Sequence, residues 1–282
     1  AVLGLARSGL AAVRALAASG AEIVAWDDKD EARTLAADYA ELTDLMQIDL
    51  AGFDGILVSP GVPINTHPLA AKAYDAHVRL IGDIELFALA RPELPAHKVV
   101  AITGTNGKST TTALIHHIIK AAGIPTLMGG NIGLPILGEE PLPTGGVYVL
   151  ELSSFQIDLT YSLAADIAVL TNVTPDHLDR YDGFAGYLAS KERLFTLEHA
   201  DNLAIIACDD DPSKIIGSRV NHRLIRLSGK DIEDQSRWPA LQGPHNAQNA
   251  ACAIATCQAL GIEDAIIERA LTSFGGLPHR ME

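Results

Sequence analysis

Short runs of strand-forming residues alternate with stretches of helical periodicity along the whole chain. In its first part, residues 1–5, 22–26 and 55–58 have the composition of buried strands, and apolar side chains on one helical face predict a helix over 10–18. Strands and helices in this order form parallel β-α-β units with right-handed crossovers. The pattern therefore predicts an α/β fold.

The same pattern resumes after the Pro-containing segment 91–95. The expected strands are 98–103, 147–150, 167–170, 203–207 and 223–227, and the expected helices are 109–122, 184–197, 246–260 and 264–271. This order predicts a second, larger and mostly parallel sheet that helices cover on both faces.

Composition and charge narrow the functional classes. The 282 residues are 48% hydrophobic and 20% charged, as in ordinary globular proteins. A net charge of −14 without a Lys/Arg cluster argues against a nucleic-acid partner. The longest apolar run, 250–262, is too short to cross a bilayer, no signal peptide precedes the first strand, and Cys208, Cys252 and Cys257 have no disulfide or zinc spacing. We expect a cytoplasmic protein without a membrane partner, trimmed at its front because it opens inside a strand.

A Gly-rich turn between a predicted strand and a predicted helix, Thr103–Thr110, has the features of a phosphate-binding loop. Its glycines allow backbone N–H groups to close on phosphates, Lys108 would neutralise their charge, and Ser109 would ligate Mg²⁺. Ile102 stands where the strict G-x-x-x-x-G-K-[ST] pattern has its first glycine, so the alternative is a turn with a solvated lysine. The position between strand and helix favours the phosphate loop.

Two further groups of polar side chains follow predicted strands, at the sheet edge where open α/β sheets bind ligands. Glu151 is either a metal ligand or an acid that interacts with a helix dipole. His177, within residues 171–180, is either a surface hydrogen-bonding group or part of a Mg²⁺ site. Lys191, from its sequence context alone, is a helix-surface lysine paired with acids.

Three other segments bear on nucleotide binding. The turn Gly4–Gly9 spaces its glycines too widely for a dinucleotide fingerprint, which argues against NAD, but Asp27 ends the next strand where an acid meets a ribose or a base. Asn246 either caps the predicted helix 246–260 or, with Asn249, contacts an adenine edge. Asp209–Pro212 is predicted to be a turn at a strand end.

Taken together, these motifs resemble the Mur ligases. The stretch Gly104–Thr110 resembles their ATP loop, which folylpolyglutamate synthases share. Similarity to the D-glutamate-adding branch of the family, including its uridine-binding domain, is carried by Gly129–Gly133, Glu151–Gln156, Asp176–Tyr181, Gly4–Gly9, Trp26–Asp28 and Ser59–Gly61. The resemblance runs from the first residue to the last.

The resemblance implies an ATP-dependent ligase that joins D-glutamate to UDP-N-acetylmuramoyl-L-alanine through an acyl phosphate in peptidoglycan precursor synthesis, and that is a monomer. The implied ATP-binding residues are Gly104, Thr105, Asn106, Gly107, Lys108, Ser109, Thr110, Asn246, Asn249 and Arg280. Two Mg²⁺ ions would be bound by Ser109, Glu151, His177 and Lys191, the last as a carbamate formed with CO₂. The implied catalytic residues are Lys108, Glu151, His177 and Lys191, and the implied substrate contacts are Ser8, Gly9, Asp27, Asp28, Ser59, Asn131 and His177.

The domain organisation follows from the pattern and the resemblance together. We expect a Rossmann-like UDP-substrate-binding domain at 1–91, a linker at 92–97, a P-loop-type ATPase domain at 98–277, and the start of an absent C-terminal domain at 278–282. The chain would then bind substrate but turn over poorly. Two alternatives stay open: a folylpolyglutamate-type ligase, which lacks a uridine-binding first domain, and a non-catalytic nucleotide-binding module, which needs no second cation site.

Overall fold

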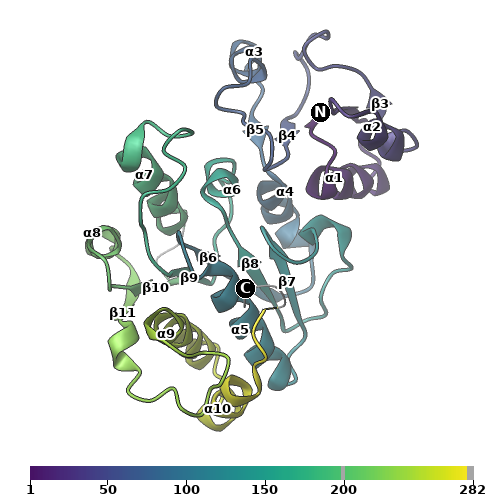
Figure 1. Cartoon of the computed structure of the whole chain (residues 1–282). Coiled ribbons are helices and arrows are strands. Elements are labelled where there is room, and N and C mark those ends of the chain that lie inside the picture. The colour runs from purple at the N-terminus through teal and green to yellow at the C-terminus, as the bar shows by residue number, and fades with distance from the viewer. Residues whose placement is uncertain (198–200, 278–282) are drawn as a thin grey trace. The chain divides into compact units, whose positions relative to one another are not determined.

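The computed structural model describes residues 1–197 and 201–277, and these divide into two compact α/β units (Figure 1). Unit 1 contains residues Ala1–Glu93 and two short segments from later in the chain, Leu134–Glu140 and Asp158–Leu163. Unit 2 contains the remaining described residues from Leu94 on. The predicted fold class, two α/β parts with parallel sheets, is confirmed.

Unit 1 is built on a five-stranded parallel sheet with the order β3-β2-β1-β4-β5. Its strands are β1 (Val2–Leu3), β2 (Val24–Trp26), β3 (Glu41–Leu42), β4 (Ile56–Val58) and β5 (Leu80–Ile81). Its helices are α1 (Arg7–Ala18), α2 (Asp30–Ala36), α3 (Leu69–Asp75) and α4 (Asp83–Ala90), with 3₁₀ turns η1 (Arg91–Glu93) and η2 (Ile136–Gly138). The chain reverses its direction across the sheet between β1 and β4, which creates a crevice beyond the carboxyl ends of these strands.

Alternate residues of the strands in unit 1 pack on opposite faces of the sheet, so that each face has its own core. The core against α1 consists of Val2, Leu5, Ala12, Val13, Ile23, Ala25, Ala36 and Leu57. The core against α3 consists of Leu3, Leu45, Leu50, Ile56, Val58, Leu69, Ala73, Val78 and Leu159. Two adjacent residues of β1, Val2 and Leu3, thus anchor helices on different faces.

The two segments that join unit 1 from later in the chain have specific contacts there. The buried carboxylate of Glu85 accepts hydrogen bonds from the backbone N–H groups of Tyr161 (2.6 Å) and Ser162 (2.8 Å) and from the Ser162 hydroxyl (2.7 Å). In the other segment, η2 packs against α1. Neither segment was predicted from the sequence to belong with the first part of the chain.

Unit 2 is built on a six-stranded parallel sheet with the order β11-β10-β9-β6-β8-β7. Its strands are β6 (His97–Thr103), β7 (Thr126–Gly130), β8 (Gly146–Glu151), β9 (Ile167–Leu170), β10 (Leu203–Ala207) and β11 (Arg223–Leu227). Its helices are α5 (Lys108–Ala121), α6 (Ser154–Asp158), α7 (Gly183–Thr196), α8 (Asp211–Arg219), α9 (Pro244–Ala259) and α10 (Asp264–Ser273), with the 3₁₀ turn η3 (Gly229–Asp231).

The main core of unit 2 lies between the sheet and the helices α5, α9 and α10. Ile102 and Val169 contribute from the sheet, and Leu114 and Ile118 from α5, and all four are fully buried. Figure 1 shows α7 on the opposite side of this sheet. The sheet is therefore covered on both faces, as predicted.

Several elements differ from the sequence-based expectation. The structure contains β3, β5, β7, α2, α3, α4, α6 and α8, which were not predicted. The turn expected at Asp209–Pro212 ends early, because Asp210 accepts a hydrogen bond from Ser213 N (2.8 Å) and caps α8. Of the two alternatives for Asn246, the helix cap is wrong, because α9 begins at Pro244 and Asn246 lies inside its first turn.

Candidate functional site

The predicted site residues of unit 2 gather at the carboxyl edge of its sheet. β6 leads into the loop 104–107 and then α5, β7 leads to Asn131, β8 ends at Glu151, and β9 leads into residues 171–174. In the sheet, β6 lies between β8 and β9. The strands that follow β6 in the chain are therefore added first on one side of it (β7 and β8) and then on the other (β9, β10 and β11). Open α/β sheets bind their ligands at such a reversal.

Two glycines give the loop 104–107 its shape. Gly104 has φ +151° and Gly107 has φ +81°, values that favour glycine. A Cβ on Gly104 would overlap Thr171 Oγ1, and one on Gly107 would overlap Asn249 Oδ1. The loop therefore packs closely against the residues after β9 and against α9, and its backbone is held in one conformation.

The backbone amides at the start of α5, directly after this loop, suit an anion. Asn172 accepts hydrogen bonds from Thr105 N and Asn106 N, both at 2.9 Å, and so fixes the loop from outside. The first N–H groups of α5, from Lys108 onward, lack a carbonyl partner within the helix. Such groups at a helix N-terminus bind phosphate well.

Two lysine ammonium groups converge on one oxygen of the loop. Lys108 Nζ donates to Gly104 O at 3.0 Å and to Thr105 O at 2.9 Å, and Lys191 Nζ donates to the same Gly104 O at 2.7 Å. Lys191 is 1% exposed, so its interpretation as a helix-surface lysine is wrong. Because two like charges near one oxygen repel each other, a negative charge close to the pair would be stabilising.

A buried carboxylate stands beside the loop with half of its hydrogen-bonding capacity unused. Glu151 is 1% exposed, and its Oε1 accepts a hydrogen bond from Asn131 Nδ2 at 2.9 Å. Its Oε2 is buried without any hydrogen-bond partner. Because burying an unpaired carboxylate oxygen is costly, a cation at Oε2 would complete the site. The hard oxygen of a carboxylate is a ligand that Mg²⁺ prefers.

Aromatic rings surround the His177 side of the site. The ring of Phe155 lies 5.1 Å from that of His177 and stacks on Tyr181 at 5.8 Å. The ring of Tyr187 lies 6.3 Å from that of His177, and Lys191 Nζ lies 4.6 Å from the centre of the Tyr187 ring. Tyr187 thus lies between two predicted site residues, although it was not predicted.

His177 and Tyr187, in the same part of the site, have an unusual backbone conformation and a shifted pKa, respectively. His177 has φ +50°, which is unusual for a residue other than glycine, and its side chain is 47% exposed. The pKa of Tyr187 is raised above its usual value, because the effect of burial is larger than the opposing effect of its hydrogen bond with Thr105. The exposed position of His177 leaves its ring accessible to a ligand.

Protein side chains alone do not complete a metal site here. Among residues 1–197 and 201–277, no three His, Cys, Asp or Glu side chains stand close enough together to hold a metal ion. Mg²⁺ usually keeps several waters and binds substrate phosphates beside one or two carboxylates. Glu151 fits that role, and the predicted set Ser109, Glu151, His177 and Lys191 stays a prediction.

The predicted adenine contacts lie against the phosphate loop. Asn249 is 4% exposed, its Oδ1 accepts a hydrogen bond from Thr111 Oγ1 at 3.3 Å, and its Nδ2 donates to Asn246 Oδ1 at 3.2 Å. The adjacent Gln248 donates to Thr171 O. In the structure Asn249 therefore positions the loop, and its contact with adenine stays a prediction. Arg280 lies outside the described residues.

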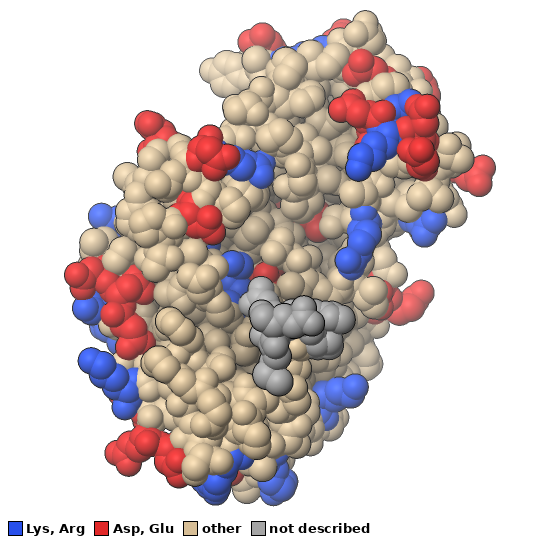
Figure 2. Space-filling model, viewed as in Figure 1, with Lys and Arg blue, Asp and Glu red and all other residues tan. Residues whose placement is uncertain are grey.

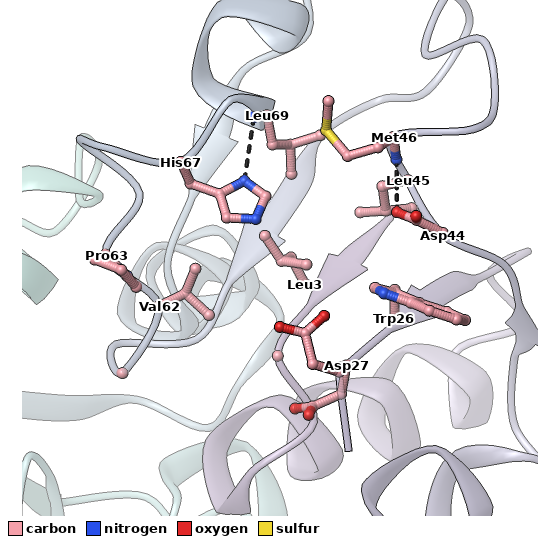
Figure 3. Close-up of a pocket in the computed structure, with 13 residues that line it drawn as sticks. Leu3, Trp26, Asp27, Asp44, Leu45, Met46, Val62, Pro63, His67 and Leu69 are labelled. Carbon is pink, nitrogen blue, oxygen red and sulfur yellow. Dashed lines mark hydrogen bonds between the residues drawn. The ribbon is translucent and has the colours of Figure 1, made fainter. Parts of the chain in front are cut away.

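Unit 1 has a cavity of about 430 Å³ at the carboxyl ends of β1, β2 and β4 (Figure 3). Two of the predicted substrate contacts, Asp27 and Asp28, line it. The other lining residues are Leu3, Gly4, Trp26, Asp44, Leu45, Met46, Gly61, Val62, Pro63, His67 and Leu69. We call this cavity the switch-point pocket, because it lies where the chain reverses direction across the sheet.

The other predicted contacts in unit 1 build the turn beside the switch-point pocket. Ser59 is 4% exposed and donates to Gly4 O at 2.8 Å. A Cβ on Gly9 would overlap Gly4 O, which explains a glycine at the start of α1. Asp27 accepts hydrogen bonds from Leu5 N (2.6 Å) and Lys29 N (2.9 Å) and so ties two turns together. Ser8 lies in the first turn of α1.

Two residues of the switch-point pocket were not predicted as ligand contacts and have suitable chemistry. His67 Nδ1 accepts a hydrogen bond from Leu69 N at 3.1 Å, so its neutral ring carries the proton on Nε2 and can donate it (Figure 3). Trp26 offers an aromatic surface, and the Arg33 guanidinium lies 4.3 Å from its ring centre. Only the fold brings His67 near Trp26, so their spacing in the sequence gives no signal.

The surface and the helices carry two further observations. Figure 2 shows Lys and Arg interspersed among Asp and Glu on the face drawn. Within residues 1–197 and 201–277, we find no helix with the length and apolar character that a bilayer crossing requires.

Comparisons with known proteins agree on the family. Residues 102–240 match the Mur ligase middle domain. The UDP-N-acetylmuramoylalanine–D-glutamate ligase of Sphingopyxis alaskensis is 70% identical over 100% of this chain, which covers 66% of that protein. The enzyme of the same name from Zymomonas mobilis is 57% identical over 100% of this chain, which covers 67% of that protein. The chain thus spans about two thirds of the length of the curated relatives that it matches.

Solved structures share the fold. The UDP-N-acetylmuramate:L-alanyl-gamma-D-glutamyl-meso-diaminopimelate ligase from Neisseria meningitides matches with a TM-score of 0.65 and 15% identity, over 98% of each chain. The UDP-N-acetylmuramate-alanine ligase from Thermotoga maritima matches with a TM-score of 0.56 and 18% identity, over 98% of this chain and 68% of that one. The relatives' identity, the domain match and the loop and carboxylate at the sheet edge agree, and the chain belongs to the Mur ligase family.

Proposed function

We propose that the whole protein is an ATP-dependent ligase that adds D-glutamate to UDP-N-acetylmuramoyl-L-alanine. The observation that carries the proposal is the juxtaposition of loop 104–107 and the unpartnered Oε2 of buried Glu151 at one sheet edge. The names of the most similar relatives support D-glutamate as the added amino acid. An enzyme of this kind works on small molecules, without nucleic acid.

The chemistry requires two anions to approach each other. The substrate carboxylate attacks the γ-phosphorus of ATP, ADP leaves, and the resulting acyl phosphate reacts with the amine of D-glutamate to give an amide and phosphate. When bound, Mg²⁺ would neutralise phosphate charge, with Glu151 and Ser109 as its protein ligands. Lys108 and the amides at the start of α5 would bind the triphosphate and hold it in line for attack.

The switch-point pocket of unit 1 would hold the uridine diphosphate part of the substrate. Its location at the carboxyl ends of β1, β2 and β4 is where such sheets bind nucleotides. Trp26 would offer a surface on which a base stacks, and His67 Nε2 would offer a hydrogen-bond donor. Asn131 and His177, both exposed at the edge of unit 2, would contact the muramoyl side of the substrate.

Lys191 is proposed to react with CO₂. Its ammonium would lose one proton to give an amine, the amine nitrogen would form an N–C bond to CO₂, and a second proton would leave the nitrogen. A buried cation would thereby become an anionic carbamate whose oxygens can ligate Mg²⁺. The burial of Lys191 and its position beside the Lys108 ammonium support the proposal, because a carbamate would attract the second lysine instead of repelling it.

A calorimetric titration tests the proposed function. The chain is titrated with UDP-N-acetylmuramoyl-L-alanine, and UDP-N-acetylmuramate and a folate serve as comparisons. We expect the alanyl substrate to bind more tightly than the form without alanine, and the folate not to bind. Binding of the folate, or no binding of either UDP-linked compound, would contradict the proposal.

A further inference from the structure

One lysine of unit 1 uses its whole ammonium group to hold a loop. Lys72, on α3, donates from Nζ to three main-chain oxygens, those of Leu45 (3.0 Å), Met46 (2.9 Å) and Ile48 (2.5 Å). An ammonium group has three N–H donors, so these bonds use all of them. Within the described part of the chain, Lys72 forms no ion pair, and the three carbonyl oxygens are the hydrogen-bond partners of its ammonium group.

The loop that Lys72 holds has little regular structure of its own. Residues 43–52 form most of the connection from β3 to β4 and contain neither a helix nor a strand. Two local turns shape it, in which Asp44 accepts from Met46 N and Asp49 accepts from Ala51 N, both at 2.9 Å. Leu45 is 1% exposed and anchors one end in the core. Without a donor at their centre, three convergent carbonyl oxygens would repel one another and lose their hydrogen-bond partner.

The same loop forms one wall of the switch-point pocket. Asp44, Leu45 and Met46 line the pocket, and Figure 3 shows them on the side that faces Trp26 and Leu3. Lys72 itself is not among the lining residues. Its ammonium binds the wall through the carbonyl groups of two lining residues, so any relaxation of these carbonyl groups changes the shape of the pocket.

We propose that Lys72 is a positioning residue for the nucleoside diphosphate of the substrate. It acts through the loop 43–52, which it holds in the conformation that closes one side of the switch-point pocket. The inference rests on the proposed function, since it takes this pocket to be the UDP site. It assigns a role in substrate binding to a residue outside every motif that the sequence contains.

Substitution of Lys72 by Met tests this role, because Met keeps an unbranched side chain of similar length and removes the charge. UDP is the probe, and its binding is followed by the fluorescence of Trp26 in a Trp238→Phe background, which leaves one tryptophan. We expect Lys72→Met to weaken UDP binding about tenfold, the effect of losing roughly one charge-assisted hydrogen bond. Binding of a non-hydrolysable ATP analogue, at unit 2, should not change.

The matched control is Tyr74→Ala on the same helix. Tyr74 is 80% exposed, so its removal perturbs α3 without affecting the loop. Hydrogen exchange of residues 43–52 is measured without UDP, because loop order is the proposed cause. We expect faster exchange there in Lys72→Met and unchanged exchange in Tyr74→Ala.

Chemical rescue separates loss of the ammonium from general damage. Lys72→Cys, in a Cys208→Ser background, is alkylated with 2-bromoethylamine, which restores an ammonium at nearly the same distance, or with iodoacetamide, which does not. We expect the first reagent to recover UDP binding and loop protection, and the second to recover neither. If Lys72→Met does not fold, this pair of alkylated proteins still gives the answer.

The outcomes distinguish the two proposals. If the wild-type chain does not bind UDP, the proposed function is contradicted and this inference falls with it. If the wild-type chain binds UDP and Lys72→Met binds it equally well, only the inference is overturned. Weaker UDP binding without faster exchange of residues 43–52 also overturns it, because Lys72 would then act by another route.

Discussion

Asn131 and Glu151 are joined by a hydrogen bond of 2.9 Å, from Asn131 Nδ2 to Glu151 Oε1, across the ends of two adjacent strands. A second bond, from Asn131 N to Glu151 O at 2.8 Å, fixes the backbone as well. The amide thus sets the orientation of the carboxylate, and Oε2 is left without a partner. A residue expected to contact substrate therefore also orients the candidate metal ligand.

Glu151→Gln should separate two effects of this carboxylate: its effect on the stability of the ligand-free protein and its contribution to Mg²⁺ binding. Without ligand, we expect the variant to be as stable as the wild type or more stable, because a buried oxygen that lacks a partner is no longer charged. With Mg²⁺ and a non-hydrolysable ATP analogue, we expect the wild type to gain melting temperature and the variant to gain little. Differential scanning fluorimetry of both proteins, with and without Mg²⁺, measures this. An equal gain in both would exclude Glu151 as a metal ligand.

Carbamylation of Lys191 should be visible by mass. We expect native mass spectrometry in bicarbonate buffer to show the mass of one added CO₂, which is lost on acidification and absent from Lys191→Met. Lys108→Met serves as the comparison, since it removes the other ammonium at Gly104 O and should keep the added mass. An added mass that persists in Lys191→Met would place the modification elsewhere.

The sequence predicted the elements that have strong local signals. β6, β9, β10 and β11 lie within one residue of their expected bounds, because apolar residues predominate in each of them. The strands β3 and β5 have two residues each, and α2 and α3 have seven each. Elements this short contain fewer than two full helical turns or a single strand alternation, so their apolar positions repeat too few times for pattern analysis to detect them.

Local motifs likewise located the candidate site but not the contacts within it. The Gly-rich turn and Glu151 were found because each directly follows a strand. The contact between Asn249 and Thr111 joins residues 138 positions apart, and no local pattern encodes it. Lys191 was misjudged for the same reason, since its burial depends on packing of α7 against loop 104–107.

Gly107→Ala should destabilise unit 2 by more than the free energy that the backbone strain at this position costs. A non-glycine residue at φ +81° costs about 1–3 kcal/mol, and the added Cβ would also overlap Asn249 Oδ1. Gly123→Ala is the matched control, because Gly123 has φ +74° and open space around its Cβ position. We expect a larger loss of melting temperature for Gly107→Ala, and a partial recovery when Asn249→Ala is added. Equal losses for the two glycine variants would show that the overlap with Asn249 is relieved at no cost.

His116 should make stability depend on pH. Burial, followed by the nearby charges of Lys120 and His117, lowers the pKa of His116 below its usual value of 6.5. The unfolded chain therefore binds a proton more readily than the folded one, so the contribution of His116 to stability is present above pH 6.5 and is lost as the pH falls through the lowered pKa.

The measurement is the melting temperature of wild type and of His116→Gln, which can keep a hydrogen bond to Thr126 Oγ1, between about pH 7.5 and about pH 5.5. The wild type should lose more stability than the variant as the pH falls, because only the wild type has to protonate this half-buried ring. His117→Gln, on the neighbouring position of α5, removes the smallest of the three causes of the lowered pKa of His116, so its curve should lie between those of the wild type and His116→Gln and closer to the wild type. Parallel curves for wild type and His116→Gln would mean that other groups cause the acid sensitivity.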